Sequence, residues 1–228
     1  MKEGKILAIL PVRKNSKRVA FKNLKKFSDS NLLEIKLKVL KSIEIIDNIL
    51  VSSDWDEALD IAKNYNVLTH EREKYYASSE CSSDENIKYI TNYIKTLPEN
   101  YKYLLYTPVT SPLIKKNTII NFINKYFTIN DKYKSMVTTT KLNKFLYFKN
   151  KPLNFNIHKF SKSQDLNFGD IILFSLSINT LENQLKTFLI DENPYFYNLS
   201  DIEAIDIDYP IDFEIAEFLY NRYRKREI

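Results

Sequence analysis

Residues 5–24 read KILAILPVRKNSKRVAFKNL, and this stretch decides the fold class. Its first part, Lys5–Val12, is a nearly continuous apolar run with Pro11 near its end. Such a run is typical of a strand that is buried on both faces of a parallel sheet. The residues that follow are polar and basic, so we expect a loop over 13–26. A buried strand that leads into a basic loop predicts an α/β protein.

The rest of the first half alternates between strand and helix patterns. We expect strands over 48–53, 66–69 and 101–108, and helices over 32–45, 56–65, 83–97 and 115–127. Strands that alternate with helices of this length form βαβ units. The predicted fold is therefore Rossmann-like, a mostly parallel sheet flanked by helices. Ligands bind beyond the carboxyl ends of such strands, so loops that follow strands are the candidate site.

The second half has a different pattern. We expect strands over 135–141, 146–149, 171–176 and 193–199, and an amphipathic helix over 212–222. The stretch 151–170 has no helical period. Because no linker or repeat interrupts the chain, we predict a single domain over residues 1–228 with an embedded β excursion.

Composition narrows the class of protein. A chain of 228 residues can bury about three quarters of its unfolded surface, and 44% hydrophobic with 28% charged residues is ordinary for a soluble protein. One cysteine, Cys81, excludes an internal disulfide framework and suits a cytoplasmic location. No apolar run reaches the ~20 residues of a membrane span. The net charge of +5 comes from scattered lysines and one dense run at 222–226, for which a solvated helix end is a better explanation than nucleic-acid binding. A small anionic substrate also suits this balance.

The loop after the first strand is rich in cations. Five of its positions are basic: Arg13, Lys14, Lys17, Arg18 and Lys22. Arginine offers a planar fork to phosphate oxygens and lysine a mobile point charge, so this loop suits a triphosphate. On composition alone, a solvated basic loop is the simpler explanation.

Two acids near the carboxyl end form the second candidate. Asp206 and Asp208 alternate with Ile205 and Ile207, which places both carboxylates on one side of an extended segment. Mg²⁺ prefers one or two protein carboxylates together with phosphate oxygens. The alternative is a pair of acids on a solvated strand end, and the residues alone do not decide between the two.

Residues 10–24 resemble a signature of the CMP-acylneuraminate and CMP-Kdo synthetases, the cytidylyltransferases that activate nonulosonates: I-P-A-R-x-x-S-K-R-x-x-x-K-N-[IL]. Further motifs of that family follow in order. They are V-S-[ST]-D at 51–54, R-P-x-x-x-A-x-[DS]-x-x-[ST]-S at 72–83, T-S-P-L at 110–113, and D-I-D-T-x-x-D-[FL]-x-x-A-E within 204–217.

The resemblance implies roles for individual residues. The implied catalytic residues are Arg13, Lys22, Asp206 and Asp208, of which Asp206 and Asp208 would bind Mg²⁺. The implied substrate-binding residues are Leu10, Lys17, Asn23, Arg72, Ser83, Thr110, Ser111, Lys144, Lys162 and Gln164. The sequence departs from the family at Pro108, where a glutamine reads cytosine, at Ile114, and at Lys162, where an arginine is usual.

The resemblance further implies a cytoplasmic enzyme that transfers CMP from CTP to an acidic sugar and releases pyrophosphate. It implies a homodimer in which an arm, residues 143–170, reaches the partner's site, with neither a nucleic-acid nor a membrane partner. Two alternatives stay open: a different acid or phospho-acceptor, and a non-catalytic nucleotide-binding subunit.

Three smaller expectations concern single residues. We expect Asp54 to cap the helix at 56–65, with Glu57 completing a capping box. We expect Ser82 or Ser83 to cap the helix at 83–97. Arg18 is expected to point to solvent, and His70 to be structural.

Overall fold

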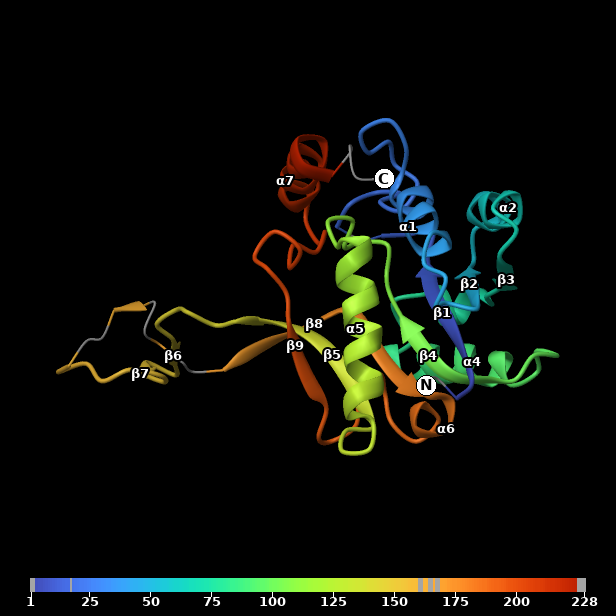
Figure 1. Cartoon of the computed structure of the whole chain (residues 1–228). Coiled ribbons are helices and arrows are strands. Elements are labelled where there is room, and N and C mark those ends of the chain that lie inside the picture. The colour runs from blue at the N-terminus through green and yellow to red at the C-terminus, as the bar shows by residue number, and fades with distance from the viewer. Residues whose placement is uncertain (1–2, 17, 160–161, 164–165, 167–168, 225–228) are drawn as a thin grey trace.

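A seven-stranded sheet in the order β3-β2-β1-β4-β8-β5-β9 forms the centre of the molecule (Figure 1). The computed structural model describes residues 3–16, 18–159, 162–163, 166 and 169–224, without the side chain of Arg224. The strands are β1 Lys5–Val12, β2 Asn48–Ser53, β3 Leu68–Glu71, β4 Tyr101–Tyr106, β5 Ser135–Lys141, β8 Asp170–Thr180 and β9 Tyr195–Asn198. Only β8 runs antiparallel to its neighbours, β4 and β5, so the predicted Rossmann-like, mostly parallel sheet is confirmed.

Helices cover both faces of this sheet (Figure 1). They are α1 Leu32–Lys41, α2 Asp56–Asn64, α3 Lys74–Ala77, α4 Ser83–Ile94, α5 Lys116–Ile129, α6 Leu181–Gln184 and α7 Pro210–Leu219, which continues as a π-helix, Tyr220–Arg224. Strand β1 contributes Ala8 and Leu10 to the larger core and Leu7 and Ile9 to the smaller one beneath α4. Burial on both faces explains why this strand is apolar at nearly every position.

The element bounds differ from the predicted ones in instructive places. Helix α1 ends at Lys41, earlier than expected, because Ser42 caps it and its Oγ donates to the Val39 carbonyl at 2.7 Å. Strand β8 is longer than predicted, since it pairs with both β4 and β5. The single turns α3 and α6 were not predicted, because four residues are too few to show a helical period.

The prediction for Asp54 is wrong. Helix α2 begins after Trp55, which provides no side-chain cap. Asp54 Oδ1 instead accepts a hydrogen bond from the backbone N–H of Lys14 at 3.0 Å. Asp54 therefore fastens the basic loop to the end of β2, and its local capping pattern was misleading.

A hairpin arm extends far from the sheet beyond β5 and β8 (Figure 1). Strands β6 Tyr147–Phe148 and β7 Lys151–Pro152 pair in antiparallel fashion. Lys149 and Asn150 between them have φ values of 49° and 62°, as a two-residue turn with left-handed residues requires. The arm exposes Phe145, Tyr147, Phe148, Leu153 and Ile157. An excursion at the expected place is present, and its role in dimerisation stays a prediction.

His70 is buried beneath α4, as a structural residue should be. Its Nδ1 lies 3.0 Å from Ser52 Oγ, and its ring stacks on Tyr93 with centroids 3.9 Å apart. Burial lowers the pKa of His70 to about 4.

No helix in the described part of the chain is long and apolar enough to cross a bilayer.

The buried histidine predicts a specific acid sensitivity. His70 titrates near 6.5 when the chain is unfolded and near 4 when folded, so the unfolded state binds the proton first. Stability should therefore fall as the pH drops from 6.5 toward 4, by at most about 3 kcal/mol from this residue. The free energy of unfolding, measured by urea titration across that window, should fall less steeply in His70→Asn. Parallel pH profiles for the two proteins would contradict the assignment.

Candidate active site

A pocket of about 560 Å³ lies beyond the carboxyl ends of the parallel strands. Eight of the residues predicted for the site line it: Arg13, Lys22, Asn23, Arg72, Ser83, Thr110, Asp206 and Asp208. They come from four segments that are far apart in the sequence, 10–24, 72–83, 110–113 and 204–217. The strand-end rule therefore located the pocket correctly.

The basic loop forms one wall of this pocket. Asn23 is buried, and its Nδ2 donates to the Arg13 carbonyl at 3.0 Å, which fixes the loop. The Arg13 side chain is exposed and has no hydrogen bond or ion pair within the described residues. Its guanidinium is therefore available to an anionic ligand.

Lys22 connects the basic loop to the acidic segment. Its Nζ donates a hydrogen bond to the Ile207 carbonyl, between the two aspartates. Burial lowers the pKa of Lys22, while the charges of Asp206 and Asp208 act in the opposite direction. The positive charge of the half-buried Lys22 ammonium therefore offsets part of the negative charge of the two nearby carboxylates.

Asp206 and Asp208 both face the pocket, while Ile207 between them is fully buried. The Ile207 N–H donates to the Thr110 carbonyl at 2.9 Å, which holds this extended segment against the loop after β4. Ser111 Oγ lies 3.2 Å from Asp206 Oδ1 and 2.9 Å from Ser175 Oγ. The predicted alternation is confirmed at Ile207, whereas Ile205 is only partly buried.

Arg18 is exposed, as expected, but it also forms an ion pair that was not predicted. Its Nη2 lies 2.9 Å from Asp208 Oδ1, and its guanidinium is 4.9 Å from the centroid of the Tyr209 ring. Both charged side chains are about half exposed, at 47% and 45%, so the pair adds little to stability. The contact spans 190 positions and could not be seen in a local pattern.

The two acids suit a hard divalent cation. No cluster of three or more histidine, cysteine or acidic side chains that could hold a metal occurs among the described residues. Two carboxylates on one pocket wall match Mg²⁺, which takes its remaining oxygen ligands from phosphates and water. Asp206 and Asp208 therefore fit the predicted ion.

Arg72 also lines the pocket and is 4% exposed. Its Nη2 donates to the Val12 carbonyl at 2.7 Å and its Nη1 to Asn86 Oδ1 at 3.0 Å, while its Nε has no partner among the described residues. Burial lowers the pKa of Arg72, and the nearby carboxylate of Asp54 opposes that effect.

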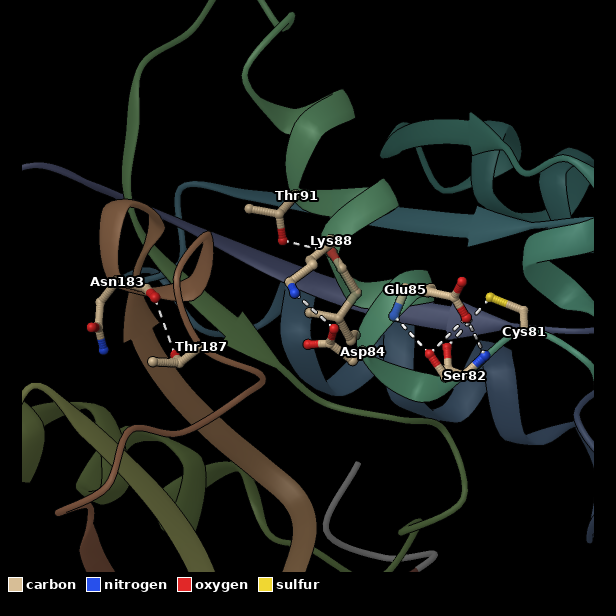
Figure 2. A network of polar contacts seen from close by, with 9 residues as sticks. Cys81, Ser82, Asp84, Glu85, Lys88, Thr91, Asn183 and Thr187 are labelled. Atoms are coloured by element: carbon tan, nitrogen blue, oxygen red, sulfur yellow. Dashed lines mark hydrogen bonds and ion pairs between the residues drawn. The ribbon is translucent and has the colours of Figure 1, made fainter.

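The start of α4 lies beside Arg72, and its geometry is well defined. Ser82 is the N-cap, which confirms that prediction, and it forms a capping box with Glu85 (Figure 2). The Glu85 N–H donates to Ser82 Oγ at 3.2 Å, and the Ser82 N–H donates to Glu85 Oε2 at 2.9 Å. The helix thereby presents Ser83 and Asn86 to the pocket.

The other predicted residues lie elsewhere. The Leu10 side chain is fully buried in the core, so this residue can meet a ligand only through its backbone. Ser111 is buried and acts on the site through Asp206. Lys144 and Lys162 are exposed and do not line this pocket. Lys17 and Gln164 lie outside the described residues, and their roles stay predictions.

Sequence reasoning missed several polar lining residues: Ser16, Tyr76, Asn86 and Tyr106. Asn86 could have been found, because it follows Ser83 by three residues and shares its helix face. Tyr106 is the last residue of β4, and burial raises the pKa of its hydroxyl to about 12. It therefore stays a neutral hydrogen-bonding group.

A mostly parallel sheet with a cationic loop after β1 and paired carboxylates across the pocket defines a nucleotide-binding α/β enzyme. The chain belongs to the cytidylyltransferase family, which it matches over residues 7–222. The family resemblance of the sequence motifs is thus confirmed.

Two curated relatives extend over nearly all of this chain. An N-acylneuraminate cytidylyltransferase of Escherichia coli is 25% identical over 98% of this chain, which spans only 54% of that relative's length. A pseudaminic acid cytidylyltransferase of Campylobacter jejuni is 25% identical over 95% of this chain and 96% of its own length.

Solved structures share the fold. A CMP:2-keto-3-deoxy-manno-octonic acid synthetase complexed with CTP matches with a TM-score of 0.67 at 8% identity, over 96% of this chain and 99% of the other. A cytidylyltransferase from Leptospira borgpetersenii matches with a TM-score of 0.64 at 16% identity, over 99% of this chain and 90% of the other. At such low identity these structures support the fold alone.

Proposed function

We propose that this protein transfers CMP from CTP to a hydroxyl group of an acidic sugar of the nonulosonate class and releases pyrophosphate. The observation that carries the proposal is the convergence of Arg13 and Lys22 with Asp206 and Asp208 in one pocket. The family and the relatives named for N-acylneuraminate and pseudaminic acid support the same chemistry.

The chemistry needs positioning and charge neutralisation. The acceptor hydroxyl loses its proton to solvent as its oxygen attacks the α-phosphorus of CTP. The bond from that phosphorus to the oxygen bridging to the β-phosphate breaks, and pyrophosphate leaves with the negative charge. Arg13 and Lys22 would bind the β- and γ-phosphates and stabilise that charge. Mg²⁺, held by Asp206 and Asp208, would supply further neutralisation at the phosphates. The Lys22 contact with the Ile207 carbonyl keeps its ammonium in place beforehand.

We further propose a homodimer. The arm exposes Tyr147 at 57% and Phe148 at 60%, and apolar side chains gathered on a projecting hairpin are typical of an interaction surface. Lys144 and Lys162 lie in the arm region, outside the pocket of their own chain. In a homodimer, these lysines would complete the part of the partner's pocket that binds the acceptor sugar.

The proposed setting is the cytoplasm, where CTP is made and where a lone cysteine stays reduced. Activated acidic sugars of this kind are expected to feed surface-polysaccharide assembly. Neither nucleic acid nor a membrane is a proposed partner.

A pyrophosphate-release assay tests the proposed function. The enzyme with Mg²⁺ is offered CTP, UTP, ATP or GTP, each with N-acetylneuraminic acid, pseudaminic acid, Kdo or a phosphorylated sugar alcohol. We expect release with CTP and at least one nonulosonic acid, and background with Asp208→Asn.

Other outcomes of this assay identify the alternatives. Pyrophosphate release only with the phosphorylated sugar alcohol would identify a phosphorylated acceptor in place of the acidic sugar. Such a result would agree with lysine at position 162, where the family usually has arginine. Absence of release from every combination would contradict catalysis and favour a nucleotide-binding subunit.

A further inference from the structure

The cytosine base presents a specific pattern of hydrogen-bonding groups. Its amino group N4 donates, and N3 and O2 accept, whereas uracil accepts at O4 and donates at N3. A side-chain carboxamide carries an acceptor beside a donor and so matches either base, depending on which way it is turned. Pro108 lines the pocket and offers neither a side-chain polar atom nor an N–H. The Pro108 side chain therefore cannot distinguish the two bases, and the polar side chains among the other lining residues are the candidates.

Two carboxamides line the pocket in the described part of the chain, Asn23 and Asn86. Asn23 is 5% exposed and uses its Nδ2 on the Arg13 carbonyl at 3.0 Å. Asn86 is partly exposed, and its Nδ2 donates to no described residue. Asn86 therefore has the free donor that a base acceptor needs.

The orientation of the Asn86 amide is fixed by Arg72. Asn86 Oδ1 accepts from Arg72 Nη1 at 3.0 Å, and Arg72 is itself held by the Val12 carbonyl at 2.7 Å. A flipped amide would turn its N–H donors toward the guanidinium, which has only donors. The capping box at the start of α4 fixes the backbone beneath Asn86 (Figure 2).

We propose that Asn86 is a specificity-determining residue that distinguishes cytosine from uracil, with Arg72 as the residue that positions it. Asn86 Nδ2 donates to cytosine N3, and Oδ1 accepts from N4 with its second lone pair. Uracil would need the amide flipped, which the guanidinium forbids. The assignment rests on the proposed use of CTP.

Isothermal titration with CTP and with UTP, in the absence of an acceptor, tests this assignment. We expect the wild type to prefer CTP, and Asn86→Ala to weaken CTP binding by ~10- to 100-fold with little change for UTP, so that the preference collapses. Asn86→Asp keeps the contact with Arg72 but replaces the donor by an acceptor, which suits uracil N3–H. The new acceptor opposes cytosine N3 and the other oxygen still opposes uracil O4, so each base has one matched and one opposed contact, and the preference for CTP should likewise be lost. Asn92→Ala, an exposed asparagine on the same helix, is the matched control and should leave the ratio unchanged.

The possible results distinguish a failure of the Asn86 assignment from a failure of the proposed function. Equal losses for CTP and UTP in Asn86→Ala, or an unchanged ratio in both Asn86 variants, would overturn the specificity role. Preserved CTP preference in binding, without pyrophosphate release from any acceptor, would contradict the proposed function and leave the role of Asn86 supported.

Discussion

Replacing Asp208 or Asp206 by Asn is expected to lower kcat by ~10²-fold or more, because each change removes one charge from the phosphate site and keeps the side-chain shape. CTP should still bind, since Arg13 and Lys22 line the same pocket and are unchanged in these variants. Asp206→Asn keeps an oxygen for Ser111 Oγ, so its effect reports charge and not the lost contact. Steady-state kinetics over a Mg²⁺ titration measure the loss, and partial rescue by Mn²⁺ is expected.

A metal-binding readout accompanies the kinetics. Mn²⁺ binding in the presence of CTP, followed by electron paramagnetic resonance, should weaken in both variants. Asp201→Asn is the matched control, because Asp201 is exposed on the same connection and does not line the pocket. Full activity of Asp208→Asn at every Mg²⁺ concentration would make these acids ordinary surface residues.

Arg13→Ala is expected to reduce kcat/KM for CTP by about 10²-fold, which corresponds to the loss of a charge-assisted, forked contact to phosphate. The Arg13 guanidinium is exposed to the pocket and has no partner in the described chain that would compete with a ligand. Arg13→Lys should lie between wild type and Arg13→Ala, because lysine keeps the charge and loses the fork.

Arg18→Ala is the comparison for that result. Arg18 contacts Asp208 in a half-exposed ion pair, so its loss should cost less than tenfold. Both variants should unfold at the wild-type temperature, because neither side chain is part of the core. Equal and mild losses of kcat/KM in the two variants would indicate that the loop is a solvated surface loop that does not bind CTP.

The parts of the fold that could be predicted were those in which burial requires consecutive residues to be apolar. Lys5–Val12 and Asn48–Ser53 were predicted with their observed bounds, because strands covered on both faces are apolar throughout. In the arm, the expected strand over 146–149 contains β6, whereas β7 was not predicted, since a strand of two residues leaves no pattern.

The parts of the site that escaped prediction depend on contacts between distant segments. The capping pattern at Asp54 is local, whereas its hydrogen-bond donor, Lys14, lies 40 positions earlier. Arg18 meets Asp208 only because the segment after β9 returns across the sheet to the first loop. Asn86 shares a helix face with Ser83, but the packing of α4 beside Arg72 decides that this face meets the pocket.

In the proposed homodimer, the acceptor side of the site depends on more than one chain. The lysines expected to meet the acidic sugar, Lys144 and Lys162, lie outside the pocket of their own chain, whereas the residues expected to meet CTP largely line it. A partner's arm is the proposed source of the missing groups, and under that proposal only the nucleotide half of the site is formed by one chain.

Phosphorus NMR of the complete reaction tests the central claim, which is cytidylyl transfer, most directly. Enzyme, CTP, Mg²⁺ and the nonulosonic acid selected by the pyrophosphate assay are followed over time. We predict that the three CTP resonances decay together while one phosphodiester resonance of a CMP-sugar and the resonance of pyrophosphate grow in equal amounts. Appearance of free CMP with pyrophosphate, or of CDP with inorganic phosphate, and no phosphodiester signal would contradict the transfer.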